Sequence, residues 1–87
     1  MSVVIEPLFS KGDYIINRSA GDIAIVKGIS KKGYYQFDAY YNAMLNELTD
    51  LKKYTYELQV NYQKFFEHCN KDEKDKINKI IEERKMA

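Results

Sequence analysis

The chain has 87 residues, and its 14 Lys and Arg against 13 Asp and Glu give a formal net charge of +1. This length provides room for one hydrophobic core, so we expect residues 1–87 to form a single domain. A charge this close to zero gives no electrostatic argument for nucleic acid or for an acidic membrane surface. No apolar run approaches the roughly 18–20 residues that cross a bilayer, so no membrane contact is expected.

Two further features of the composition concern the compartment. The first seven residues lack the basic leader and the apolar stretch of a secretion signal. The single cysteine, Cys69, cannot form an internal disulfide. We therefore expect a cytoplasmic protein.

The residues that interrupt regular structure are confined to the front of the chain. All four glycines and the single proline lie within residues 1–33, and none occurs from Tyr34 onward. Because glycine and proline favour tight turns, the front is typical of strands and the back of longer elements. The sequence predicts an α+β fold, with a bent antiparallel sheet over about 8–60 and a helical segment over about 61–86.

Two short strands are predicted first, joined by a hairpin. Asp13–Asn17 is β-prone and leads into the small polar loop Asn17–Asp22. Ile23–Ile29 is β-branched at most positions and apolar on both faces. Gly28 within this run indicates a bulge or a sharp bend, because glycine weakens regular strand pairing. A second turn follows over Ser30–Gly33.

A third strand is predicted over Tyr34–Tyr41, where the side chains alternate. Successive side chains of a strand point to opposite faces. The face expected to form the core carries Tyr35, Phe37, Ala39 and Tyr41. The opposite face carries Tyr34, Gln36, Asp38 and Tyr40. We therefore expect the rings of Tyr34 and Tyr40 to be exposed.

Residues 42–60 allow two interpretations. Apolar side chains recur at three- and four-residue steps from Tyr41 to Cys69, which is typical of one amphipathic helix over about 40–69. Against this, residues 54–60 alternate in the manner of a strand, and residues 50–53 would form the turn before it. A helix of about 30 residues is far longer than the average of about 11–12, so the strand is favoured.

The last predicted element is a helix that begins after Asn70. Asn70 is a favourable N-cap, and Glu73 stands three residues later, which is the spacing of a capping box. A narrow apolar edge would dock this helix on the sheet: Ile77, Ile80 and Ile81. A short helix that starts at residue 61 or 62 and ends at residue 69 is expected before it.

With these strands in place, the front of the chain resembles a small SH3-like barrel of the KOW type. The resemblance lies in Phe9–Ile15, with its Lys-Gly-Asp turn, and in Gly21–Ile29, which is similar to the second barrel strand and its bend. The polar cap and charged start of the last helix resemble the ends of short hypothetical proteins of gut bacteria and their phages. Together the resemblance covers about residues 8–42 and 69–82.

The resemblance implies a binding or accessory role in a bacterium or its phage, such as inhibition of a host protein. It carries no catalytic residue across. Residues 42–53 depart from it, because they are richer in helix formers than a barrel loop.

The chain offers little material for catalysis. The only histidine and the only cysteine, His68 and Cys69, are adjacent, and neighbours on a helix point about 100° apart. We therefore expect Cys69 in the core and His68 at its rim rather than a nucleophile–base pair. A zinc site needs about four ligands of this kind, so no metal or cofactor is expected. The chain is predicted not to be an enzyme.

The candidate site rests on the tyrosines, of which the chain has eight. Exposed tyrosine is amphipathic and stiff, and it is enriched at protein interfaces. The predicted partner-binding residues are Tyr34, Tyr40, Lys31 and Lys32. We expect a protein partner or self-association as a homodimer. The alternative is a nucleic-acid-binding barrel, in which the rings stack on bases and Lys27, Lys31 and Lys32 contact phosphates.

Overall fold

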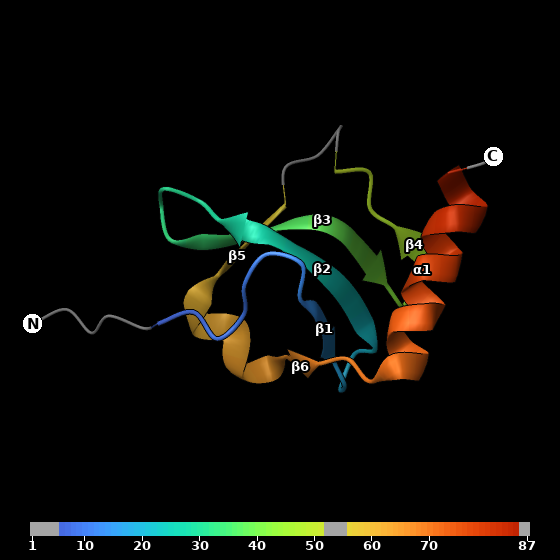
Figure 1. Cartoon of the computed structure of the whole chain (residues 1–87), viewed down its shortest axis with the longest axis horizontal. Coiled ribbons are helices and arrows are strands. Elements are labelled where there is room, and N and C mark those ends of the chain that lie inside the picture. Colours follow the sequence, from blue (N-terminus) through green and yellow to red (C-terminus); the bar gives the residue numbers. More distant parts are fainter. Residues whose placement is uncertain (1–5, 52–55, 86–87) are drawn as a thin grey trace, which may run out of the picture.

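Within residues 6–51 and 56–85, which it describes, the computed structural model has six antiparallel strands in one sheet, followed by an α-helix (Figure 1). The strands are β1 Tyr14–Asn17, β2 Asp22–Ile29, β3 Tyr34–Asn42, β4 Glu47–Leu48, β5 Glu57–Gln59 and β6 Glu67–His68. A 3-10 helix, η1 (Val60–Phe65), lies between β5 and β6, and the helix α1 spans Lys71–Lys85. The predicted α+β fold class is confirmed.

The first three strands form a meander, and the shorter strands extend it. Across the sheet the order is β4, β3, β2, β1 and β6, while β5 pairs with the start of β3 and β4 pairs with its end. In the part of the chain that the structure describes, this sheet does not close on itself. All three strands predicted before residue 42 are confirmed, with ends that differ by one residue at most.

β2 carries an irregularity beside Gly28, as the sequence predicted. The β2–β3 pairing contains one extra residue, Lys27, between the pairs formed by Val26 and by Gly28. Gly28 has a φ of 155°, and nothing lies within 4 Å of the place where a Cβ would stand. A bulge bends a strand and increases its twist. This one lies in the second half of β2, which pairs with β3 but not with β1.

A second bulge, at Asp38 in β3, changes which side chains face the core. The register places Phe37 and Ala39 opposite adjacent residues of β2, so β3 has one residue more at this point. The alternation therefore shifts, and Tyr40 lies on the same side as Phe37. Ala39 and Tyr41 are buried as predicted, but the expectation that they share one face with Phe37 is wrong, because they face the opposite side of the sheet.

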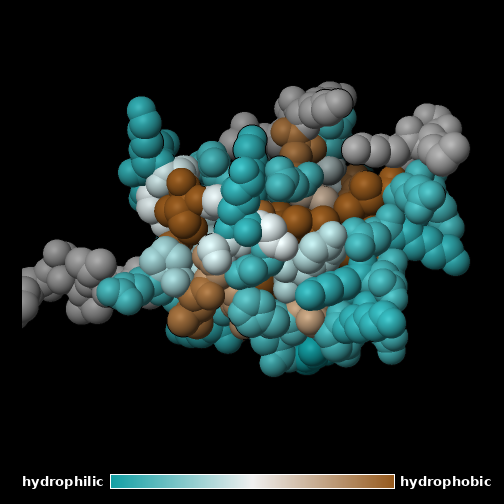
Figure 2. Space-filling view, viewed as in Figure 1, coloured by the Kyte–Doolittle hydropathy of each residue, from teal (hydrophilic) through white to brown (hydrophobic). Residues whose placement is uncertain are grey.

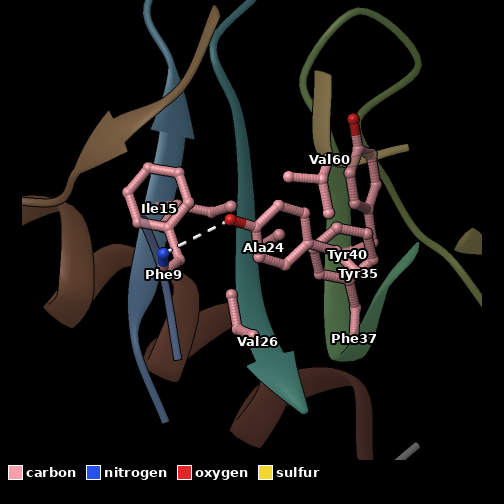
Figure 3. Close-up of a cluster of buried hydrophobic side chains, with 8 residues drawn as sticks. All are labelled: Phe9, Ile15, Ala24, Val26, Tyr35, Phe37, Tyr40 and Val60. Atoms are coloured by element: carbon pink, nitrogen blue, oxygen red, sulfur yellow. Dashed lines mark hydrogen bonds between the residues drawn. The ribbon is translucent and has the colours of Figure 1, made fainter. Parts of the chain in front are cut away.

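The sheet buries side chains on both of its faces. The first core cluster joins the N-terminal segment, the first three strands and η1 (Figure 3): Phe9, Ile15, Ala24, Val26, Tyr35, Phe37, Tyr40 and Val60. The helix-side cluster joins the other face to α1: Ile16, Ile23, Ala39, Tyr41, Cys69 and Ile77. Adjacent residues such as Ile15 and Ile16 enter different clusters, as strand alternation requires.

The interval between β3 and α1 is built from short elements. The helix over about 40–69 is wrong, since the described part of this interval holds β4, β5, η1 and β6. The strand expected over 54–60 is confirmed at Glu57–Gln59, and its first two residues, like residues 52 and 53 of the expected turn, lie outside the described residues. The short helix expected before α1 is present as η1, but it is a 3-10 helix that ends at Phe65.

The start and the docking edge of α1 agree with the sequence. The amide N–H of Asn70 donates to Oε1 of Glu73 at 2.8 Å, and the amide N–H of Glu73 donates to Oδ1 of Asn70 at 2.9 Å. These reciprocal hydrogen bonds form the predicted capping box. Ile77 is fully buried in the helix-side cluster, and Ile80 and Ile81 pack against it. The isoleucine edge is therefore confirmed.

One arginine ties the β1–β2 hairpin to both β6 and α1. The Arg18 guanidinium forms an ion pair with Glu67 of β6. It also donates to the Glu73 carboxylate, from Nη1 at 2.5 Å and from Nη2 at 3.1 Å, in the bidentate arrangement that strengthens such contacts. The hydrogen bonds from Arg18 and from the Asn70 amide lower the pKa of Glu73 below its ordinary value.

The lowered pKa of Glu73 determines how stability should depend on pH. In the unfolded chain Glu73 takes up its proton near about pH 4.3, whereas in the folded chain it does so at a lower pH. The ionised carboxylate stabilises the fold fully above the unfolded-state pKa, and this contribution is lost as the pH falls through the folded-state pKa. In urea unfolding from about pH 6 to about pH 3, Glu73→Gln should start less stable than wild type and lose less stability with acid.

Glu83→Gln is the matched control, because Glu83 is an exposed residue of the same helix and the substitution removes the same charge. This variant should keep the pH dependence of the wild-type chain. An equally strong pH dependence in both variants would contradict a stabilising contact between Arg18 and Glu73.

Candidate functional site

Three of the four predicted site residues lie together at the tip of the β2–β3 hairpin. Lys31 and Lys32 are exposed in the turn between the strands. Ser30 closes this turn, since its carbonyl accepts from the Gly33 N–H at 2.9 Å and its Oγ accepts from the Tyr34 N–H at 3.2 Å. Tyr34 is half-buried at the start of β3, next to β5. The tip therefore presents two lysines beside one tyrosine.

Tyr40 is not part of that surface, and its predicted exposure is wrong. The bulge at Asp38 turns Tyr40 into the first core cluster, where only 6% of it is exposed. Its hydroxyl donates to Oδ2 of Asp22 at 2.9 Å, and its ring centroid lies 4.6 Å from that of Tyr56. Burial raises the pKa of the Tyr40 hydroxyl well above its ordinary value. Tyr40 also stands roughly 20 Å along β3 from Tyr34.

A different pair of aromatic rings is exposed, on η1. Tyr62 is 45% exposed and Phe65 is 55% exposed, and their rings stack with centroids 6.3 Å apart. A 3-10 helix has three residues per turn, so residues three apart stand on the same side. The Nζ of Lys64 lies 5.4 Å from the centre of the Phe65 ring, within the range of a cation–π contact. We call Tyr62 and Phe65 the aromatic face of η1.

The opposite side of η1 is fixed to the core. Val60 and Gln63 are also three residues apart, and both are buried. Oε1 of Gln63 accepts from the Tyr35 hydroxyl and from the Leu8 N–H, the latter at 2.9 Å. Nε2 of Gln63 donates to the Glu6 carbonyl at 2.9 Å. The amide thus uses both its acceptor and its donor, and it joins η1 to β3 and to the N-terminal segment.

The Tyr35 hydroxyl holds the N-terminal segment in place. It accepts from the amide N–H of Leu8 at 3.0 Å and from that of Phe9 at 3.3 Å, the second of which is drawn in Figure 3. Phe9 is therefore buried, whereas Leu8 remains 67% exposed beside η1. Figure 2 shows hydrophobic residues gathered at this end of the molecule, where the N-terminal segment, η1 and the β2–β3 hairpin lie.

The aromatic face was not expected from the sequence, because Tyr62 and Phe65 belong to an apolar stripe that is typical of the buried side of an amphipathic helix. In a 3-10 helix of six residues, the side chains of Val60 and Gln63 lie on one side and those of Tyr62 and Phe65 lie on another. The three-residue spacing of the two aromatic residues is visible in the sequence. The burial of Gln63, which makes the two rings point outward, is not visible in the sequence.

His68 and Cys69 lie where the sequence predicted. Cys69 is buried in the helix-side cluster, and the exposed His68 packs edge-on against the Phe9 ring at 5.1 Å. Burial, with a smaller effect of the Glu73 carboxylate, raises the pKa of the Cys69 thiol to about 11. The thiol therefore stays protonated at neutral pH, and a protonated thiol is a weak nucleophile. The core role of Cys69 is confirmed.

Neither a cluster of metal-ligating side chains nor a membrane-spanning helix is present within residues 6–51 and 56–85. In these ranges, no three side chains of His, Cys, Asp or Glu are grouped so that they could hold a metal ion. No helix in the same ranges has the length and apolar character needed to cross a membrane.

Comparison with known proteins returns no relative of this chain. It matches no family model, no curated protein and no solved structure. The candidate site is therefore defined by the geometry of the chain's own residues.

The Gln63 contacts predict a large effect of one substitution. Gln63→Leu keeps the side chain's bulk but leaves the buried Tyr35 hydroxyl without its acceptor, so the free energy of unfolding should fall by about 1–3 kcal/mol. Urea unfolding monitored by tyrosine fluorescence measures this free energy, since the chain has no tryptophan. Gln59→Leu is the control, because Gln59 is exposed in β5 and should tolerate the same exchange. Equal losses in both variants would show that the buried amide has no special role.

Proposed function

We propose that this chain is a non-catalytic protein-binding module that engages its partner with the aromatic face of η1. Leu8 and the tip of the β2–β3 hairpin flank this face. The observation that carries the proposal is that Tyr62 and Phe65 stand about half exposed on a helix whose other side is locked into the core. Aromatic side chains are enriched at protein interfaces and supply much of the binding free energy there.

The size of the exposed rings supports this function. A fully buried aromatic side chain removes about 150–250 Å² from water. Burying the exposed half of one ring would therefore contribute roughly 2–3 kcal/mol at about 25 cal/mol per Å². The hydrogen bonds of Gln63 hold η1 in position before any partner arrives. A preformed surface loses little conformational entropy on binding.

The wider proposal is an SH3-like small domain that acts as an accessory factor or an inhibitor of a host protein in a bacterium or phage. The meander of β1, β2 and β3 and the bend of β2 beside Gly28 support the SH3-like part. The net charge of +1 is consistent with a partner selected by shape and apolar contact rather than by bulk charge. A second copy of the chain is included among the possible partners.

The test removes the aromatic face and leaves the fold intact. Proteins captured from an extract of the source organism are identified, and the purified partner is titrated against the wild-type chain and Tyr62→Ser/Phe65→Ser. The double variant should bind at least roughly 30-fold more weakly, because two centrally placed rings are lost. Light scattering of the chain alone measures self-association, which the double variant should also weaken where it occurs.

Met44→Ser/Leu45→Ser is the matched control. Met44 and Leu45 are 89% and 64% exposed, but they lie in the turn after β3, at the opposite end of that strand from the hairpin tip. This variant should bind the partner as the wild-type chain does. The proposal is overturned when the double variant at Tyr62 and Phe65 keeps wild-type affinity for the purified partner.

We propose one alternative function, that of a nucleic-acid-binding barrel. The observation that favours it is the charge of the β2–β3 hairpin, where Lys27, Lys31 and Lys32 stand without a carboxylate between Ile23 and Phe37. Tyr34 beside them could stack on a base. The exclusion of Tyr40 leaves this surface with one of its two expected rings, and we therefore rank it second.

Ionic strength distinguishes the two functions. Three lysine contacts to a single strand would weaken binding of a labelled oligonucleotide roughly 20-fold between about 50 and 200 mM salt, and Lys31→Gln/Lys32→Gln would reduce that dependence. Lys71→Gln/Lys79→Gln, on the exposed side of α1, removes the same charge elsewhere and should leave binding nearly unchanged. Absence of oligonucleotide binding at low salt would remove the alternative.

A further inference from the structure

A groove with a volume of about 510 Å³ lies between the sheet and α1, away from the aromatic face of η1. Aliphatic side chains from β2, β3, β4 and α1 form its floor: Ile25, Ala39, Leu48 and Ile81. Figure 2 shows hydrophobic residues along the strip between the sheet and the helix. Volumes of roughly 300–1,000 Å³ are typical of ligand-binding sites. The groove is thus large enough to accept several aliphatic groups.

The groove exists because α1 covers only part of the helix-side cluster. Ile77 is fully buried, whereas Ile81, one turn later, is only partly buried. Beneath Ile81 the sheet contributes Ala39, whose small side chain is paired across the strands with Ile25. The bulge at Asp38 is what turns Ala39 toward this side. A small residue at the centre and larger ones around it leave an apolar hollow.

The charged residues around this hollow differ in whether their side chains already have partners. The Arg84 guanidinium donates to the Asn46 carbonyl at 2.9 Å and to Oδ1 of Asn46 at 3.0 Å, and it lies 5.9 Å from the Tyr41 ring. Asp38 is exposed at the groove, and its carboxylate makes no hydrogen bond or ion pair with any residue that the structure describes. Asp50 contributes a second carboxylate to the lining. The Arg84 guanidinium is thus engaged with Asn46 and Tyr41, whereas the Asp38 carboxylate is available to a ligand.

We infer that this groove binds a segment of a partner protein in which aliphatic side chains stand beside a lysine or arginine. The aliphatic groups would fill the hollow over Ala39, and the basic side chain would meet Asp38. A peptide fits better than a small molecule, because the groove is partly open to solvent, whereas small-molecule sites bury most of the ligand's surface. This second site is independent of the proposed function of the aromatic face.

The test uses two short peptides and methyl NMR of the full chain. The probes are the capped tetrapeptides Lys-Leu-Ile-Lys and Glu-Leu-Ile-Glu, which share their aliphatic pair and differ in charge. The lysine peptide should shift the methyl signals of Ile25, Ala39 and Ile81 and leave that of Leu8, beside η1, unchanged. Its dissociation constant should be about two- to fivefold below that of the glutamate peptide, as expected for an exposed ion pair.

Two variants test whether these methyl shifts arise from binding in the groove. Asp38→Asn should abolish most of the preference for lysine, and because Asp38 is exposed the substitution should leave the fold intact. Ala39→Leu should fill the hollow and suppress binding of both peptides. If Ala39→Leu does not fold, the peptide pair and Asp38→Asn still decide the question.

Any of four results would overturn the inference. The first is a lack of methyl shifts in the groove at millimolar peptide, and the second is shifts confined to Leu8 and the surface around η1. The third is tighter binding of the glutamate peptide, which would assign the charge preference to Arg84. A preference for the lysine peptide that Asp38→Asn leaves unchanged would likewise place the recognition elsewhere.

Discussion

The buried amide of Gln63 is the interaction on which the arrangement of this small domain depends. It joins η1, the Tyr35 hydroxyl of β3 and the backbone of the N-terminal segment. A buried amide without partners destabilises a fold by about 1–3 kcal/mol, so its hydrogen bonds restrict the three segments to one relative position. Among the described residues, no buried side-chain nitrogen or oxygen lacks a partner. The orientation of the aromatic face of η1 follows from this one side chain.

On the opposite side of the sheet, an ion pair and a helix cap, rather than a buried amide, hold α1 in place. Glu73 accepts from the Asn70 amide and from Arg18, so one carboxylate both starts α1 and attaches it to the β1–β2 hairpin. The helix then contributes Ile77 to the core, whereas Ile81, one turn later, is only partly buried beside the groove. The two candidate surfaces therefore differ in origin. The aromatic face is exposed because the other side of η1 is fixed to the core, whereas the groove exists because α1 covers the helix-side cluster incompletely.

Features that depend on a few neighbouring residues could be predicted from the sequence. The capping box of Asn70 and Glu73, the first three strands and the burial of Cys69 are of this kind. The burial of Tyr40 could not be predicted, because a bulge is a property of the register between two strands and the sequence around Asp38 does not reveal it. The outward direction of Tyr62 and Phe65 was hidden for a similar reason, since it depends on partners of Gln63 that are distant in sequence.

The separation between those partners has a consequence for the timing of folding. Gln63 and Leu8 are 55 residues apart in a chain of 87, so their hydrogen bond closes more than half of the chain into a loop. Contacts of such high sequence separation form late, after the loop-closure entropy has been overcome. A ribosome must therefore release most of the chain before η1 can be locked in place. The aromatic face of η1 is therefore among the last surfaces of the folded chain to reach its final position.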